Sequence, residues 1–265
     1  MNNYSIKELD LETIRPNSAS VGTTKGGSTI AVIGKRGSGK SLLIKHLLYS
    51  KKHIIPVGVV VSGTEVVNRF YEQILPDVFI HEEYSPKLLA TIIKRQENAK
   101  KYLPNPWLAL VLDDCMDDTK LFKEKTFKGL FKNGRHWDVF AIFANQYVLD
   151  FGPDLRTNVD GVFIFRETNF NNRKKIYENF ASIIPSFDIF CKLMDVFTEN
   201  YQCIYIDNQN SSSNWTDCVF YFKADANIPL FTFGASDSLH FAATRTKARP
   251  ENQDIENFLC RTYYV

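Results

Sequence analysis

A glycine-rich stretch that follows a short apolar segment constrains the fold more than any other part of this 265-residue chain. Residues 29–33 read Thr-Ile-Ala-Val-Ile, and residues 34–41 match the pattern G-x-x-x-x-G-K-[ST]. A strand at 29–33 and a helix after residue 40, with Leu43 and Leu47 on its apolar face, supply the context that this pattern needs. Because backbone N–H groups converge on anions at such a helix start, the stretch predicts a nucleotide phosphate site.

The predicted nucleotide contacts are Gly34, Lys35, Arg36, Gly37, Ser38, Gly39, Lys40 and Ser41. The glycines let the loop adopt backbone conformations that are closed to larger residues. Lys40 is expected to reach the β- and γ-phosphates, and the Ser41 hydroxyl to bind Mg²⁺. The alternative is a glycine-rich turn without a ligand, which the flanking strand and helix make the weaker interpretation.

A second apolar run, residues 107–114, ends in the two carboxylates Asp113 and Asp114. Ligands of open α/β sheets bind beyond the carboxyl ends of the strands, so this strand is expected to deliver both side chains to the phosphate loop. Asp113 would hold Mg²⁺, usually through water, and Asp114 would orient or deprotonate the attacking water. The alternative is an Asp-Asp pair that only caps the next helix.

A third buried run, residues 139–144, is followed by Asn145 and Gln146. The amide of Gln146 at that strand end would again lie near the phosphates, unless it is only a buried or capping glutamine. The predicted nucleotide is ATP with Mg²⁺, and the candidate catalytic residues are Lys40, Asp114, Gln146 and Arg135, the last of which rests on a resemblance given below.

Buried-strand patterns alternate with helical periodicity along most of the chain, which predicts an α/β fold with a mainly parallel, doubly wound sheet. Helices are expected over 65–75, 85–101 and 119–133, the last one ending at the C-cap Gly134, and further strands over 54–61, 78–80 and 161–165. Residues 202–206 and 218–223 alternate as an antiparallel hairpin at the sheet edge. The predicted organisation is an N-terminal arm (1–28), a nucleotide-binding domain with the edge hairpin (29–230) and a C-terminal tail (231–265).

Composition excludes several other classes of protein. The net charge is only +2, so a polyanion partner would have to bind a local basic surface. The five cysteines are scattered without a C-x-x-C pair, which is typical of reduced intracellular thiols and argues against a zinc site. No run of about 18 apolar residues occurs, so we expect no membrane span and no secretion.

The ordered motifs resemble those of the FtsK–HerA superfamily of DNA-pumping ATPases, and most closely those of the packaging ATPases of large nucleocytoplasmic DNA viruses and virophages. The likeness spans roughly residues 28–180. The residues that carry it lie in segments 34–41, 59–65 (with Asn68 and Tyr71), 110–114, 134–136, 144–147 and 155–158. One departure is Asp114, where cellular members commonly carry the longer Glu.

The resemblance implies a RecA-like P-loop core and an ATP-hydrolysing motor that translocates double-stranded DNA into a capsid. It also implies a pentameric or hexameric ring of identical subunits, a capsid or portal partner, and a location in the host cytoplasm, at the virus factory, or in the virion. Arg135 stands where motors of this superfamily place an arginine finger that acts on the neighbouring subunit. The alternatives are a local pair between Arg135 and Asp138, or Arg156 as the finger.

Two other functions remain open from the sequence. A nucleoside or nucleotide kinase also uses a phosphate loop, and a nucleotide-dependent switch would bind ATP without sustained turnover. A DNA-contacting face, or alternatively a merely solvated one, is expected from the lysines of one helical segment: Lys120, Lys123, Lys125, Lys128 and Lys132.

Overall fold

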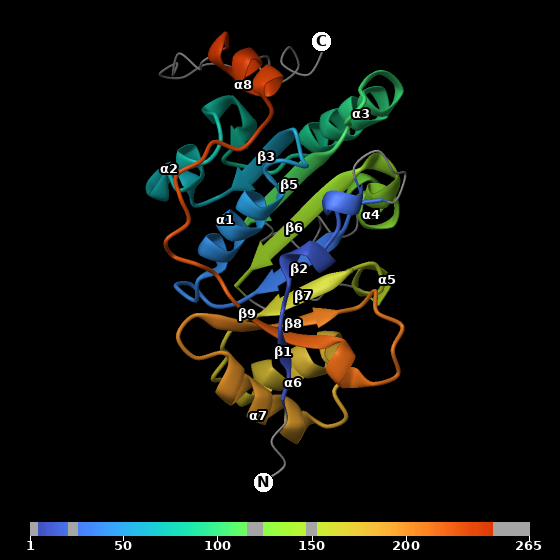
Figure 1. Cartoon of the computed structure of the whole chain (residues 1–265), viewed down its shortest axis with the longest axis vertical. Coiled ribbons are helices and arrows are strands. Elements are labelled where there is room, and N and C mark those ends of the chain that lie inside the picture. The colour runs from blue at the N-terminus through green and yellow to red at the C-terminus, as the bar shows by residue number, and fades with distance from the viewer. Residues whose placement is uncertain (1–4, 21–25, 116–123, 147–152, 246–265) are drawn as a thin grey trace.

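The structure, a computed structural model, describes residues 5–20, 26–115, 124–146 and 153–245. Within these residues a single sheet of nine strands has the order β1-β9-β8-β7-β2-β6-β5-β3-β4 (Figure 1). The strands are β1 (Lys7–Glu8), β2 (Thr29–Ile33), β3 (Val57–Ser62), β4 (Ile80–His81), β5 (Leu108–Asp113), β6 (Val139–Asn145), β7 (Gly161–Ile164), β8 (Gln202–Asp207) and β9 (Val219–Lys223). All neighbours are parallel except β8, which is antiparallel to β7 and β9. The predicted α/β class is confirmed.

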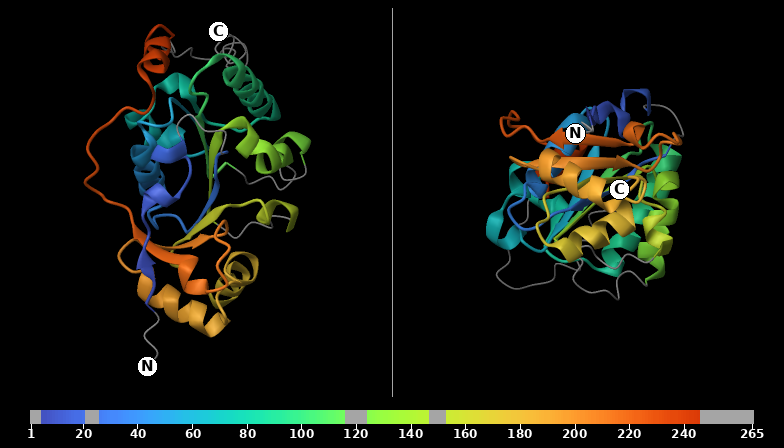
Figure 2. Two further views of the ribbon diagram at one scale, coloured as in Figure 1. Left: turned by 45° about the vertical axis from the view of Figure 1, so that its right-hand side comes forward. Right: turned by 90° about the horizontal axis from the view of Figure 1, so that it is seen from below.

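Helices cover both faces of the sheet (Figure 2). They are α1 (Lys40–Lys51), α2 (Glu65–Asn68), α3 (Pro86–Tyr102), α4 (Lys125–Asn133), α5 (Pro153–Arg156), α6 (Phe170–Phe180), α7 (Phe187–Phe197) and α8 (Ser236–Ala243). On β2, Ala31 and Ile33 face the core shared with α3, α4, α6 and α7, whereas Ile30 and Val32 face the core shared with α1. A strand buried on both faces must be apolar throughout, which explains the unbroken apolar run at residues 29–33.

The helix predicted over 65–75 is wrong in its length. α2 ends at Asn68, Arg69 adopts a left-handed φ of 46°, and a separate 3-10 turn covers Tyr71–Gln73. The Glu65 carboxylate accepts hydrogen bonds from the backbone N–H groups of Tyr71 and Glu72, at 2.8 and 2.9 Å. These side-chain contacts replace the backbone bonds that would have continued the helix.

Of two further expectations, one is confirmed and one needs correction. Gly134 is the C-cap of α4, as predicted: its φ is −54°, its N–H donates to the Leu130 carbonyl, and it opens a 3-10 turn (Gly134–Trp137) that ends at the left-handed Asp138. The hairpin of β8 and β9 is confirmed, but it does not form the edge of the sheet, since β1 pairs with β9 through Lys7 and Phe220.

Segments outside the predicted nucleotide-binding domain also contribute to the core. Ile6 and Leu9 lie in the two opposite core clusters, and Phe233 joins the cluster under α1. The division at residues 28 and 230 stays a prediction. None of the helices in the described ranges is both long and apolar enough to cross a membrane.

Candidate nucleotide site

The glycine-rich loop connects β2, in the middle of the sheet, to the start of α1. Gly37 and Gly39 have φ values of 76° and 106°, which a side chain would strain. A Cβ atom at Gly34 would lie 2.5 Å from Ser38 Oγ and 2.8 Å from Phe165 Cβ, so that position has room only for glycine. The Gly34 N–H donates to the Asn145 carbonyl at 3.1 Å, which ties the loop to the end of β6.

Lys40 is the first residue of α1, and its side chain is nearly buried. Its ammonium donates to the Gly34 carbonyl at 2.9 Å and to the Lys35 carbonyl at 3.4 Å, and lies 3.8 Å from Asp114 Oδ2. Because a buried ammonium needs such partners, the loop holds the Lys40 charge at the position predicted for phosphate binding.

Asp114 follows β5 with a left-handed φ of 46°. Its N–H donates to the Ala144 carbonyl at 3.1 Å, and its Oδ2 accepts a hydrogen bond from Gln146 Nε2 at 3.0 Å. The Asp114 Oδ2 atom therefore lies next to both Lys40 and Gln146. As predicted, these three residues follow three separate strands. Their catalytic roles stay predictions.

Asp113, the last residue of β5, is only 3% exposed. Its Oδ2 accepts a hydrogen bond from the Tyr71 hydroxyl at 2.8 Å, and its buried Oδ1 has no hydrogen-bond partner. Burial raises the pKa of Asp113 to about 6, against the lowering effect of the Tyr71 hydrogen bond. A buried carboxylate with one unsatisfied oxygen is poised to accept a cation or a donor.

The residues present fit the predicted Mg²⁺. Magnesium prefers oxygen ligands and is commonly bound through one or two protein groups together with substrate phosphates. Asp113 offers its free Oδ1, and the neighbouring loop supplies the Ser41 hydroxyl. No group of three or more His, Cys, Asp or Glu side chains that could hold a metal occurs in the part of the chain that the structure describes. Oxygens from a bound nucleotide and from water would complete the coordination.

Two acidic residues near the site had no predicted role, although each follows a strand end. Glu65 comes after β3, is 4% exposed, and has a raised pKa because burial outweighs its backbone hydrogen bonds. Glu167 comes shortly after β7. In both cases the sequence signal was a carboxylate that closely follows a buried strand. Tyr71, which holds Asp113, was named only among the residues that carry the family resemblance and had no predicted role, because its position depends on where α2 ends.

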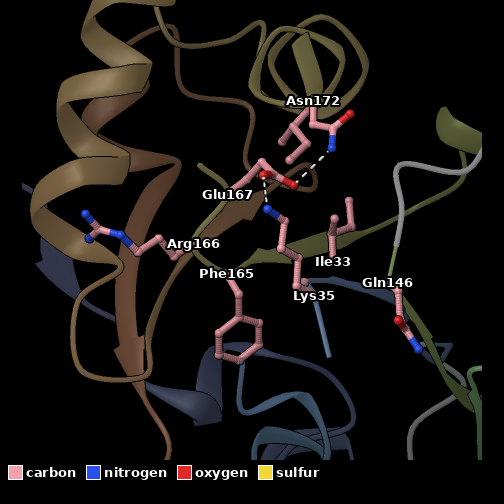
Figure 3. Close-up of a pocket in the computed structure, with 9 residues that line it drawn as sticks. Ile33, Lys35, Gln146, Phe165, Arg166, Glu167 and Asn172 are labelled. Atoms are coloured by element: carbon pink, nitrogen blue, oxygen red, sulfur yellow. Dashed lines mark hydrogen bonds and ion pairs between the residues drawn. The ribbon is translucent and has the colours of Figure 1, made fainter. Parts of the chain in front are cut away.

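Lys35 reaches toward Glu167, as Figure 3 shows. Its ammonium lies 2.7 Å from Glu167 Oε1 and donates to Thr168 Oγ1 at 3.2 Å, and Asn172 Nδ2 donates to the other Glu167 oxygen at 3.2 Å. Burial acts to raise the pKa of Glu167. The hydrogen bonds from Lys35, Asn169 and Asn172 together outweigh this effect, so the pKa is lowered overall. Lys35 and Arg36, both predicted nucleotide contacts, are solvent-exposed residues of the loop.

Arg135 lies apart from these residues. Its guanidinium pairs with Asp160, and Asp160 Oδ2 accepts the N–H of Thr29 at 2.8 Å, at the amino end of β2. The phosphate loop follows the carboxyl end of the same strand, roughly 13 Å away at about 3.3 Å per residue. Asp138, the alternative partner, instead pairs with Lys100 at 3.2 Å, so the predicted local pair is wrong.

The other candidate residues can be placed only in part. Arg156 ends the short helix α5 and is partly buried. On α4, Lys125 and Lys132 are exposed and Lys128 is partly buried, whereas Lys120 and Lys123 lie outside the described residues.

The mainly parallel sheet and its glycine-rich loop define the RecA-like fold of P-loop NTPases. The fold is similar to that of the genome packaging NTPase B204 of Sulfolobus turreted icosahedral virus 2 in complex with AMPPCP, with a TM-score of 0.53 and 16% identity over 77% of this chain and 100% of the other. No protein-family model matches the chain.

Sequence relatives come from viruses. "Uncharacterized protein 088R" of Invertebrate iridescent virus 3 is 48% identical over 90% of this chain and 93% of the relative. "Uncharacterized protein L437" of Acanthamoeba polyphaga mimivirus is 35% identical over 79% of this chain and 76% of the relative. The chain belongs to the viral protein family that contains 088R and L437.

Proposed function

We propose that this protein is an ATP-hydrolysing motor that moves double-stranded viral DNA into a capsid. The observation that carries the proposal is the convergence of Lys40 and Gln146 on the Asp114 carboxylate beside the phosphate loop. Its viral relatives and its similarity in fold to a genome packaging NTPase support the choice of packaging among the tasks of P-loop enzymes.

The arrangement supports in-line attack of water on the γ-phosphate. Backbone amides of the loop and the Lys40 ammonium bind the phosphates and stabilise the charge that develops on them. Ser41 and Asp113 would hold Mg²⁺, which would neutralise charge on the phosphate oxygens when bound. Asp114 orients the water and accepts its proton. Gln146, which donates a hydrogen bond to Asp114, senses whether the γ-phosphate is present.

The proposed assembly is a ring of identical subunits, pentameric or hexameric, that encloses DNA and docks on a capsid or portal component. The proposed location is the host cytoplasm, at the virus factory, or the virion. Arg135 is the proposed arginine finger, because it lies at the amino ends of the strands, opposite the phosphate loop of its own subunit, and its side chain is 52% exposed. In such a ring each subunit would complete its neighbour's site.

Phosphate release with and without duplex DNA tests the proposal. Wild-type protein should hydrolyse ATP faster with duplex DNA. Lys40→Ala should abolish hydrolysis while its circular dichroism spectrum is unchanged, and Lys45→Ala, on the same helix but outside the site, should behave as wild type. A Lys40→Ala protein that hydrolyses ATP at the native rate would remove the site assignment.

The same assay separates the other two functions when nucleosides are added. A phosphorylated nucleoside as product would identify a kinase, and ATP binding with negligible turnover would identify a switch. Turnover without any DNA response would keep the ATPase and remove the motor.

A further inference from the structure

The orientation of a nucleotide on the loop follows from the order of the strands. β2 lies between β6 and β7, and the residues that would act on the γ-phosphate follow β5 and β6. If the reacting phosphate faces Asp114, the nucleoside must leave the loop on the opposite side, toward β7 and β8. Figure 3 shows this separation, with Gln146 and Arg166 on opposite sides of Lys35.

A cavity of about 530 Å³ lies on that side of the loop. Its lining combines Ser38 of the loop, Phe165 and Arg166 at the end of β7, and residues 198–202, which connect α7 to β8. The volume is within the range of small-ligand sites, roughly 300–1,000 Å³. The cavity is therefore continuous with the phosphate loop and large enough for a nucleoside.

Tyr201 is the notable side chain of this cavity. Its side chain is 65% exposed, whereas many of the other Phe and Tyr side chains in the described residues are buried. Asn200 and Tyr201 both have left-handed φ values, of 51° and 64°, which is an uncommon conformation for a bulky residue. A Cβ atom built on Gly39 would lie 3.5 Å from Tyr201 Cδ1, so the ring stands directly beside the first turn of α1.

Polar residues line the same cavity as Tyr201. Glu199, Asn200 and Gln202 line the same cavity and offer both donors and acceptors at the edge of a planar ligand. Arg166 lies 3.7 Å from Glu199 and donates to the Asp195 carbonyl at 3.3 Å, which ties the cavity wall to α7. An exposed aromatic face with polar groups at its margin matches the chemistry of a nucleobase.

We propose that this cavity is the nucleobase subsite, in which a purine base stacks on Tyr201 and presents its edge to Asn200 and Gln202. This inference rests on the proposed function, because it requires a nucleoside triphosphate on the phosphate loop. Stacking on Tyr201 would supply affinity that is independent of the phosphates, and the polar groups would discriminate between bases.

Calorimetric titration with two probes tests the subsite. ATP carries a base, and inorganic tripolyphosphate does not. Tyr201→Ala should weaken ATP binding roughly 5- to 100-fold, the range expected for loss of one base–aromatic stack. Tyr201→Phe, which keeps the ring, should bind ATP within about threefold of wild type, and all three proteins should bind tripolyphosphate equally.

Each other outcome has a definite meaning. Unchanged ATP affinity in Tyr201→Ala would overturn the subsite while Lys40→Ala still tests the phosphate loop. Equal losses of ATP and tripolyphosphate affinity would show that Tyr201 supports the loop and not the base. Wild-type protein that binds neither probe would overturn the proposed function, and the subsite with it.

A tryptophan at this position supplies a direct readout. In Tyr201→Trp, ATP should quench the fluorescence of the new indole, and tripolyphosphate should leave it unchanged. Equal signals from both probes would contradict stacking.

Discussion

The two ends of the parallel strands use buried charges in different ways. At the amino ends, the buried Asp160 and Asp138 each have a cationic partner: Asp160 pairs with Arg135 and also accepts a backbone N–H, and Asp138 Oδ2 pairs with Lys100, although Asp138 Oδ1 has no hydrogen-bond partner. At the carboxyl ends, Asp113 is equally buried, but its Oδ2 is held by a neutral phenol, and its Oδ1 has no hydrogen-bond partner.

This contrast separates charges that hold the chain together from charges that remain available to a ligand. Substitution at the amino ends should change mainly the stability of the fold, because those groups are already paired. Substitution at the carboxyl ends should change mainly ligand binding and chemistry, because burying a carboxylate without a cation is costly unless a ligand compensates for it. The predictions below test that division, from the largest expected effect to the smallest.

Arg135 is the residue that could break the division, since it lies at the amino ends but has a proposed role in a neighbouring subunit. Arg135→Ala subunits should lose hydrolysis by about 10³–10⁵-fold, the effect of an arginine finger. Mixed with Lys40→Ala subunits they should regain it, because each supplies what the other lacks. Asp160→Asn, which removes the pair but keeps the arginine, is the matched control and should remain active. No recovery in mixed rings that demonstrably form would leave Arg135 with a structural role only.

Asp114→Asn should show the opposite behaviour, with intact folding and impaired chemistry. Replacing the carboxylate by an amide of the same shape removes a general base, an effect of about 10²–10⁴-fold on the rate constant of hydrolysis. ATP affinity should be nearly unchanged, as measured by calorimetry alongside single-turnover kinetics. Asp188→Asn, at the exposed surface of α7, is the control. A rate within tenfold of wild type would exclude Asp114 as the base.

Lys51 extends the comparison to pH. α1 runs back from the loop to the amino ends, where the buried Lys51 donates to the Leu11 carbonyl at 2.7 Å. Burial lowers the pKa of Lys51 from 10.5 to about 8, although Glu12 and Asp10 act to raise it.

Between pH 8 and 10.5 the unfolded chain therefore binds more protons at Lys51 than the folded chain, so the stability contributed by this residue rises with pH. Relative to Lys51→Met, wild-type protein should gain up to about 3 kcal/mol in the free energy of unfolding across that window. Urea unfolding at both pH values measures it, with Lys45→Met as control. Parallel pH profiles of wild type and Lys51→Met would contradict the assignment.

Tyr71→Phe should have the smallest effect, confined to the carboxyl ends. Loss of the phenol would release Asp113 from its fixed orientation and weaken Mg²⁺ binding by about 10–100-fold, as loss of a hydrogen bond that orients a metal ligand commonly does. The Mg²⁺ concentration needed for half-maximal nucleotide binding measures the change, with the exposed Tyr102→Phe as control. An unchanged Mg²⁺ dependence would mean that other contacts hold Asp113.

The sequence predicted the carboxyl ends of the strands well because the signal there is local. Buried parallel strands read as apolar runs, and each run is followed by the polar residue that meets its neighbours: Asp113 and Asp114 after one run and Gln146 after another. The geometry that brings Lys40, Asp114 and Gln146 together follows directly from this pattern.

The amino ends could not be predicted, because their contacts join segments that are distant in sequence. Nothing near Arg135 indicates that Asp160 would be its partner, whereas Asp138 was close at hand and proved to pair with Lys100. Tyr71 reached Asp113 for a similar reason, since the end of α2 depends on hydrogen bonds to the Glu65 side chain. Local periodicity carries no information about such tertiary contacts.

The pairing of β1 with β9 has a consequence for the order in which the protein can fold during synthesis. Lys7 is translated early, but its partner Phe220 is translated only after the entire phosphate loop and the strand that carries Asp113 and Asp114. At about 5–20 residues per second, that interval is on the order of 10–40 seconds. Throughout it, β1 lacks its partner strand, so Ile6 and Leu9, which are buried in the folded protein, cannot reach their final packing until β9 has been made.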